Sequence, residues 1–142
     1  MLLGSMVACG GSSKTAVTAA DFIKAAQDNG MTVTDENANY TDEIFTDVQS
    51  AVHPDGWTVM FLTIDTAEHA KEYFATCKAF VESQKTGTGS AQTTERDTWA
   101  MYKQTNGGKY GYVSQIDTTL IYAFVDEAHK DAVTAFTGLI GY

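Results

Sequence analysis

The chain has 142 residues, enough for one domain of ordinary size and too few for two. A hydrophobic content of 44% with 11% aromatic residues supports a well-packed core and excludes an intrinsically disordered chain. Asp and Glu outnumber Lys and Arg by 18 to 9, the net charge is -9, and no segment is rich in basic residues. Nucleic acid and anionic lipid head groups are therefore excluded as expected partners, because both are bound through Lys and Arg.

The N-terminal residues have the pattern of an export segment followed by a tether. Residues 1–8 are apolar or small, and residues 10–17 are rich in Gly, Ser and Thr. Between them, Met6-Val7-Ala8-Cys9 resembles the lipobox of bacterial lipoproteins. The resemblance implies a truncated signal segment (1–8), cleavage before an acylated Cys9 that begins a flexible tether (9–17), and one extracytoplasmic domain (18–142) anchored to the bacterial cell membrane.

Two features of this segment depart from the lipobox family. Met6 stands where Leu is usual, and no Lys or Arg precedes the apolar residues. Because a working signal peptide has a basic start and a longer apolar run, we expect the true start codon to lie upstream of Met1. The alternative is a cytosolic protein with a chance lipobox, in which Cys9 is a free thiol. No apolar run reaches the roughly 18 to 20 residues that span a bilayer.

The first half of the domain predicts one helix and three strands. Thr18 and Asp21 form a capping box at the start of a helix that ends at Gly30. Three segments have strand character: 31–34, 45–53 and 57–64. A polar loop (35–42) separates the first two, and the turn His53-Pro54-Asp55-Gly56 joins the others. Because residues 57–64 are apolar on both faces, with Val59 and Phe61 on one and Met60, Leu62 and Ile64 on the other, they predict an interior strand.

The second half of the domain predicts two helices and three strands. Asp65 or Thr66 caps a long helix whose apolar stripe is Ala67, Ala70, Phe74, Cys77 and Val81. The Gly, Thr and Ser content of residues 85–97 predicts a mobile loop. Three further segments have strand character: 99–104, 110–116 and 119–125, the first two joined by a hairpin turn at Asn106-Gly107. Asp126 is expected to cap the last helix, and the apolar tail 139–142 is expected to dock.

These elements predict an α+β domain with a mostly antiparallel sheet of five or six strands and about three helices packed mainly on one face. Residues 58–65 and 119–126 are similar, since each is a buried strand that ends in an Asp before a helix. A strand-strand-helix pseudo-repeat and a chance similarity between two ordinary junctions both account for this pattern.

No sequence motif for catalysis, a cofactor or a metal is found. His53, His69 and His129 have no ligand spacing, and the charged neighbours of the last two predict solvated surface positions. The segment from Asp35 to Asn39 alternates oxygen-bearing side chains as a calcium loop does, but its sixth position is Tyr40 rather than Gly. Cys77 is expected to be a free, buried thiol with no disulfide to Cys9.

The aromatic residues Trp99, Tyr102, Tyr110 and Tyr112 lie on the two strands of the predicted hairpin. Exposed, they could stack on a sugar or a peptide, whereas the simpler interpretation is that they cover the sheet or the core beneath the 85–97 loop.

Residues 114–122, with the terminal Leu139-Ile140-Gly141-Tyr142, are similar to the C-terminal half of small uncharacterised lipoproteins of gut Gram-positive bacteria. That resemblance implies no activity. The sequence therefore favours a non-catalytic, lipid-anchored domain, a monomer or weak dimer, that binds a protein, peptide or cell-wall component. The alternatives are an enzyme or transporter accessory whose site is assembled from distant residues, such as His53 with acidic partners, and the cytosolic α+β protein.

Overall fold

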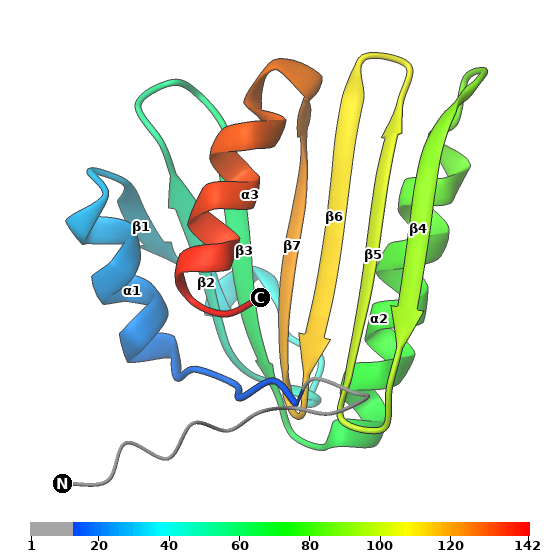
Figure 1. Ribbon diagram of the computed structural model, residues 1–142. Coiled ribbons are helices and arrows are strands. Elements are labelled where there is room, and N and C mark those ends of the chain that lie inside the picture. The colour runs from blue at the N-terminus through cyan, green and yellow to red at the C-terminus, as the bar shows by residue number, and fades with distance from the viewer. Residues whose placement is uncertain (1–12) are drawn as a thin grey trace, which may run out of the picture.

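The computed structural model describes residues 13–142 and contains one seven-stranded sheet in which every neighbouring pair is antiparallel (Figure 1). The strands are β1 (Thr32–Asp35), β2 (Phe45–Val52), β3 (Thr58–Ile64), β4 (Gly89–Glu95), β5 (Trp99–Asn106), β6 (Lys109–Ile116) and β7 (Thr119–Asp126). Their order across the sheet is β1-β2-β3-β7-β6-β5-β4. The expected α+β class and antiparallel sheet are confirmed, with seven strands instead of five or six.

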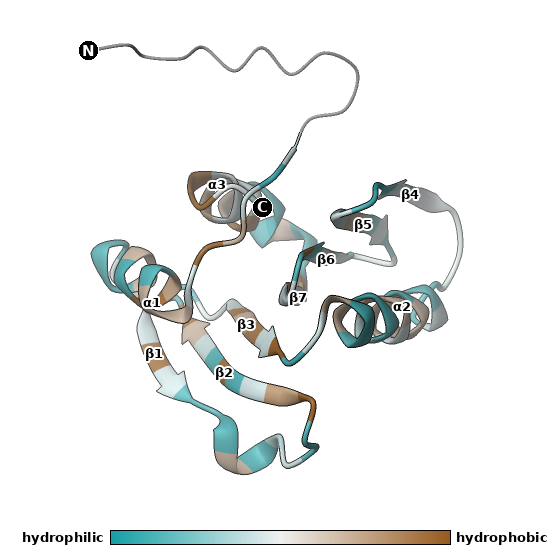
Figure 2. Ribbon diagram, turned by 90° about the horizontal axis from the view of Figure 1, so that it is seen from below, coloured by the Kyte–Doolittle hydropathy of each residue, from teal (hydrophilic) through white to brown (hydrophobic). Residues whose placement is uncertain are grey.

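In the described part of the chain, three α-helices cover the sheet, α1 (Ala19–Asp28), α2 (Ala67–Ser83) and α3 (Lys130–Leu139), and two short 3-10 helices, η1 (Asn37–Asn39) and η2 (Glu127–His129), lie in connections. Figure 2 shows α1 and α3 on one face and α2, the longest helix, on the other. The expectation that the helices gather mainly on one face is therefore corrected. Within residues 13–142 no helix is both long and apolar enough to cross a membrane.

The two-sided arrangement follows from the strands at the centre of the sheet. As expected, β3 is apolar on both faces: Phe61 packs under α1, where its ring stacks on Phe22 at 5.1 Å, and Leu62 belongs to the core under α2. In β7, Ile121 and Leu120 divide between the same two cores. Both faces of a strand with this pattern must be removed from water, so helices are needed on each side.

The starts of α1 and α2 are capped by threonines. Thr18 and Asp21 form the expected capping box of α1, and Thr66 accepts the N–H of His69 at the start of α2. Asp126 was expected to cap the last helix, but it does not. The helix η2 lies between them, and the Asp126 carboxylate pairs with Lys109 across the β6–β7 hairpin. The Asp126 carboxylate therefore stabilises the hairpin and not the start of α3.

The similarity between residues 58–65 and 119–126 reflects connectivity. In both places a hairpin, β2–β3 or β6–β7, is followed by a helix. If the two halves were a structural repeat, a twofold axis would exchange the antiparallel neighbours β3 and β7. Such an axis is perpendicular to the sheet, so it would place both following helices on the same face. In the structure, α2 and α3 lie on opposite faces. The two halves therefore share an order of elements without a common packing arrangement.

Strand β4 is the element that the sequence did not predict. The segment 85–97 was expected to be a mobile loop, but Gly89–Glu95 pairs with β5 in continuous register from Gly89↔Asn106 to Glu95↔Ala100. This strand is at the edge of the sheet and is exposed along almost its whole length. An edge strand with both faces exposed needs no hydrophobic alternation, so the pattern that identifies other strands is absent.

The predicted turns are confirmed by backbone geometry. The N–H of Gly56 donates to the carbonyl of His53 at 2.8 Å, and Gly56 has a φ of +95°. In the β5–β6 hairpin, Gly107 and Gly108 have φ values of +61° and +77°, a left-handed conformation that glycine adopts without strain.

Candidate binding site

The predicted lipidation site lies outside the part of the chain that the structure describes. Cys9 falls within residues 1–12, so its acylation stays a prediction. The described chain begins with a segment that crosses the end of the sheet, where the Lys14 ammonium lies 4.8 Å from the centre of the Trp99 ring. Trp99 is the first residue of β5, directly after the β4–β5 turn.

The three histidines are not brought together. Among residues 13–142, no group of three or more His, Cys, Asp or Glu side chains could hold a metal ion. His69 is on the surface, as expected, with 41% of its side chain exposed, and its Nδ1 lies 2.6 Å from Asp65 Oδ1. That hydrogen bond raises the pKa of His69 above its usual 6.5, because the carboxylate stabilises the protonated ring.

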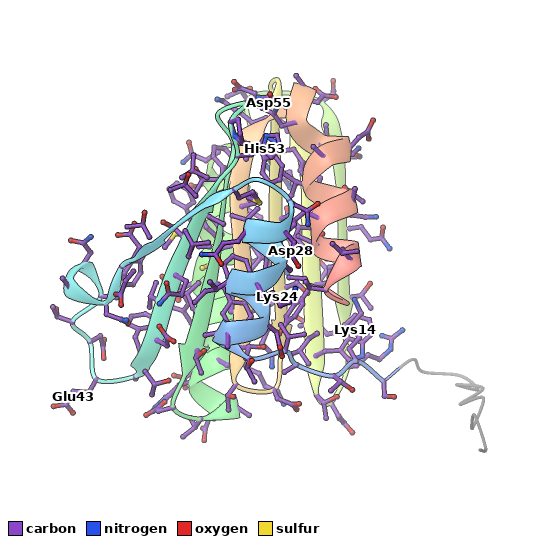
Figure 3. All side chains as sticks on the ribbon, turned by 90° about the vertical axis from the view of Figure 1, so that its left-hand side faces the viewer. Lys14, Lys24, Asp28, Glu43, His53 and Asp55 are labelled. Atoms are coloured by element: carbon purple, nitrogen blue, oxygen red, sulfur yellow. The ribbon has the colours of Figure 1, made fainter. Side chains whose placement is uncertain are left out.

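His53 is a turn residue in this structure. Its Nδ1 accepts the backbone N–H of Asp55 at 3.1 Å, and its ring stacks on Trp57 at 4.7 Å. Figure 3 shows His53 and Asp55 together at one end of the molecule. Asp55 Oδ2 also lies 3.4 Å from His53 Nδ1, so the two side chains are in contact at this turn.

The acidic loop after β1 uses its oxygens to hold strand β2. Asn37 Oδ1 accepts the N–H of Val48 at 2.8 Å, and Glu36 Oε1 accepts the Ser50 hydroxyl at 2.9 Å. These oxygens anchor the edge of the sheet and do not converge on a common point.

Cys77 is a core residue on the inner side of α2. Only 8% of it is exposed, and burial raises the pKa of its thiol to about 12. A thiol in such surroundings stays protonated at neutral pH and is a poor nucleophile. The expectation that Cys77 is a free, buried thiol is confirmed.

The four hairpin aromatics divide between the faces of the sheet and all are buried. Trp99, Tyr110 and Tyr112 belong to the core under α1 and α3, and Tyr102 belongs to the core under α2. The Tyr110 and Tyr112 rings stack at 6.2 Å. The interpretation that these residues cover the sheet is therefore confirmed, and the exposed aromatic platform is not formed.

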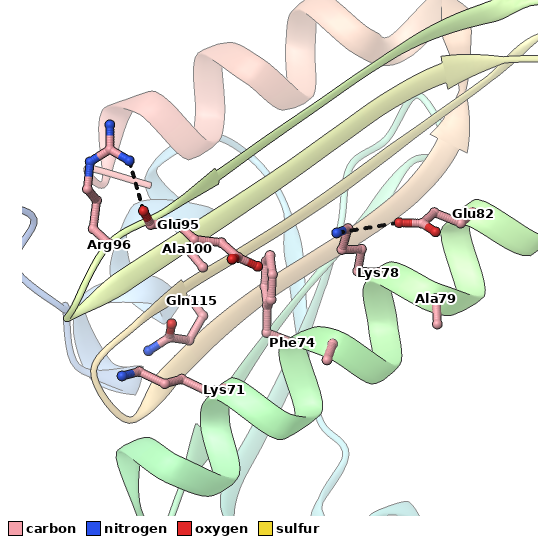
Figure 4. A pocket seen from close by; sticks show the side chains of 10 residues that line it. Lys71, Phe74, Lys78, Ala79, Glu82, Glu95, Arg96, Ala100 and Gln115 are labelled. Atoms are coloured by element: carbon pink, nitrogen blue, oxygen red, sulfur yellow. Dashed lines mark hydrogen bonds and ion pairs between the residues drawn. The ribbon is translucent and has the colours of Figure 1, made fainter.

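Two grooves flank strand β4, one on each face of the sheet. The first, which we call the α2 groove, has a volume of about 450 Å³ and lies between α2 and strands β4–β6 (Figure 4). Its floor is apolar and its walls are charged. It is lined by Lys71, Phe74, Ala75, Lys78, Ala79, Glu82, Glu95, Arg96, Ala100 and Gln115.

Gln115 is the unusual residue of the α2 groove. It is 0% exposed, and its Nε2 donates to the carbonyl of Asp117 at 2.8 Å, which orients the amide. Its Oε1 is buried and has no hydrogen-bond partner among residues 13–142. An unpartnered buried acceptor costs about 1–3 kcal/mol, so a position of this kind calls for an explanation.

Cations on the walls of the α2 groove are only partly neutralised. Lys78 lies 3.6 Å from Glu82 and also faces the Tyr102 ring, and an Arg96 guanidinium N–H donates to the backbone carbonyl of Glu95. Lys71 has no ion pair with a residue of the described chain, and Figure 4 shows its side chain reaching the same end of the groove as Gln115.

The second groove, the α3 groove, has a volume of about 500 Å³ and lies between α3 and strands β4–β6 on the other face. The Lys130 ammonium is 5.6 Å from the centre of the Tyr110 ring at its wall. It is lined by Ser90, Ala91, Gln92, Met101, Lys103, Gln104, Thr105, Tyr110, Tyr112, Lys130, Asp131, Thr134, Thr137, Gly138 and Tyr142.

The fold concentrates positive charge around β4. Five of the chain's 9 basic residues line the two grooves, but only three of its 18 acidic residues do. The sequence contains no run of basic residues, because these side chains come from α2, the β4–β5 turn, β5 and α3. Sequence reasoning missed them, and neither spacing nor composition contains a signal that would have identified them.

An antiparallel sheet covered on both faces, with a groove beside an exposed edge strand, defines a small α+β domain with a candidate ligand site. No known family model, curated protein or solved structure matches the chain significantly.

Proposed function

We propose that this protein is a lipid-anchored extracytoplasmic domain that binds a protein, peptide or cell-wall component without transforming it. The observation that supports a binding role is the α2 groove, which combines an apolar floor with a buried, unpartnered acceptor, Gln115 Oε1. Ligand sites are concave and mostly apolar, with a few placed polar groups. A ligand N–H or O–H that reached Gln115 Oε1 from this groove would satisfy the acceptor.

The anchor and the groove would lie at the same end of the molecule. Lys14 contacts Trp99 beside the β4–β5 turn, and Arg96 of the α2 groove belongs to that turn. Figure 3 shows Lys14 at the opposite end from His53 and Asp55. If Cys9 carries the lipid, the five residues to Lys14 reach at most about 17 Å, so the groove would open close to the membrane surface.

Mass spectrometry of the mature N-terminus tests the anchor. The protein is isolated from its own organism, expressed with its natural upstream DNA. We expect an acylated Cys9 with no residue before it. An intact Met1 with a free Cys9 thiol would overturn the extracytoplasmic proposal and direct the search to cytosolic partners.

NMR spectroscopy tests the binding role. The full chain carrying Cys9→Ser is titrated with a soluble cell-wall digest and with extracellular peptides of the organism. We expect the Gln115 side-chain amide and its neighbours in the α2 groove to shift, the response to weaken in Gln115→Leu, and the ligand to be recovered unchanged. Chemical conversion of a ligand would instead favour an enzyme, and shifts confined to other surfaces would reject this groove.

A further inference from the structure

We propose that the edge of β4 binds an extended acidic peptide segment as an additional strand, with alternate side chains entering the α2 and α3 grooves. This inference rests on the proposed binding role and specifies the ligand class. The strand is at the edge of the sheet and is exposed along almost its whole length.

The direction of the backbone groups of β4 follows from its hairpin with β5. The N–H of Arg96 donates to the carbonyl of Trp99 at 2.8 Å, so these residues form a hydrogen-bonded pair. In an antiparallel ladder such pairs alternate with pairs that point their N–H and C=O groups outward. With the observed register, Ala91, Thr93 and Glu95 present their backbone groups away from β5, where an added strand would pair.

The two edges of the sheet differ in protection. Natural proteins block exposed edges with short strands, charges, proline or bulges. At the other edge, β1 has four residues and ends in Asp35. By contrast, β4 has seven residues, contains no proline, and is uncharged from Gly89 to Thr94. An edge that is long, uncharged and regular is suited to strand addition.

The faces beside β4 are open on both sides. Because residues opposite each other in a ladder share a face, Ser90 and Gln92 line the α3 groove with Lys103, and Glu95 lines the α2 groove with Ala100. Side chains of an added strand would alternate between these faces. Each groove would therefore receive every second side chain of the bound segment.

Charge selects the partner. Lys71, Lys78 and Arg96 outnumber the two acids of the α2 groove, and Lys103 and Lys130 outnumber the single acid of the α3 groove. Acidic side chains are complementary to both grooves. A second copy of this chain is a poorer occupant, because its own β4 is uncharged from Gly89 to Thr94 and would bring a second set of cations to the same place.

Binding of a synthetic Thr/Glu peptide of about nine residues, with Glu on both strand faces, tests the proposal by calorimetry. The protein is the full chain carrying Cys9→Ser. We expect the Thr/Glu peptide to bind at least about tenfold more tightly than a Thr/Lys peptide of the same pattern, because the grooves carry more basic than acidic side chains. Two further peptides are N-methylated at every second amide, one at the odd positions and one at the even positions. Only one of these two peptides should lose binding, because only one set of amides faces β4.

Two matched pairs of protein variants locate the site. Thr93→Pro removes an outward N–H and should weaken binding at least about tenfold, whereas Thr93→Val keeps that N–H and should not. Lys103→Glu should weaken binding, whereas Lys24→Glu, the same charge change on α1, should not. Thermal unfolding confirms that each variant is folded, and the N-methylated peptides test the edge without altering the protein.

Equal binding of the Thr/Glu and Thr/Lys peptides, or tight binding to Thr93→Pro, would overturn the proposal. So would a dimer in sedimentation that Thr93→Pro dissociates, since a second copy would then occupy the edge. Failure here leaves the Cys9 acylation and Gln115 results unaffected, so the two proposals fail separately.

Discussion

Asp65 and His69 show how a local sequence pattern can be read for one role and serve another. Asp65 is one of the two expected caps of α2, but Thr66 provides the cap and Asp65 binds the imidazole of His69 in the first turn of the helix. The capping hydroxyl and the carboxylate are adjacent in sequence, so spacing alone could not assign them. The consequence is a surface His whose protonation is coupled to folding.

Asp65→Asn is expected to reduce stability mainly at low pH. The folded-state pKa of His69 is raised above 6.5, so its contribution is fully present below about pH 6.5 and is lost as the pH rises through the folded-state value. The deficit of the variant in urea unfolding should therefore be larger at about pH 5.5 than at about pH 8.5. An NMR titration should show a lower His69 pKa in the variant. A deficit that is independent of pH would contradict this coupling.

Close approach of α2 to the sheet depends on one glycine. A Cβ at Gly111 of β6 would lie 2.3 Å from Val81 Cγ1 and 3.3 Å from Phe124 Cδ2. Val81 is completely buried, and its carbonyl also accepts the Gln104 side chain at 2.9 Å. The helix is thus held against β6 at a distance that only a residue without a side chain permits.

Gly111→Ala is expected to destabilise the protein by about 1–3 kcal/mol through overpacking. Val81→Ala removes the clashing methyls, so the double variant should lose less than the sum of the single losses in a chemical-denaturation cycle. Gly138→Ala is the control: a Cβ there meets no atom within 4 Å, and Gly138 is in α3, so stability should rise by a few tenths to about 1 kcal/mol. Additive losses at positions 81 and 111 would reject the steric explanation.

The two ends of the described chain meet on the sheet at Tyr142. This residue is 6% exposed, its ring meets Phe61 edge-on at 6.2 Å, and its hydroxyl forms a hydrogen bond with Thr119 and accepts the N–H of Val17. The prediction that the apolar tail docks is thereby confirmed for Tyr142, whereas Leu139 is 65% exposed. The last residue joins β3, β7 and the segment before α1.

Tyr142→Ala is expected to cost about 3–5 kcal/mol, the range for truncating a buried aromatic side chain. Tyr142→Phe should cost only about 0.5–1.5 kcal/mol, because the Thr119 hydroxyl still donates to the carbonyl of Ile116 at 2.8 Å. Urea unfolding of both variants measures the difference. Equal losses in the two variants would show that the hydroxyl, and not the packed ring, stabilises the tail.

Local sequence patterns predicted those structural features that depend only on residues close together along the chain, such as strands, helix caps and turns. The alternation of Phe61 and Leu62 between two cores predicted an interior strand, the pair Thr18 and Asp21 predicted a capped helix, and Gly56 and Gly107 predicted turns. Burial periodicity, capping and positive φ each act over a few residues. The α+β class followed from these elements.

Other features depend on which segments meet in space. Strand β4 is recognisable only because β5 pairs with it, and the placement of α2 and α3 on opposite faces depends on how the sheet is covered. The two grooves collect Lys71, Arg96 and Lys103 from separate elements, and whether Gln115 Oε1 finds a partner among residues 13–142 depends on what packs around it. The distance between charges and the burial of a polar group are set by three-dimensional packing. The sequence therefore contains the residues of the site but does not show that they lie together.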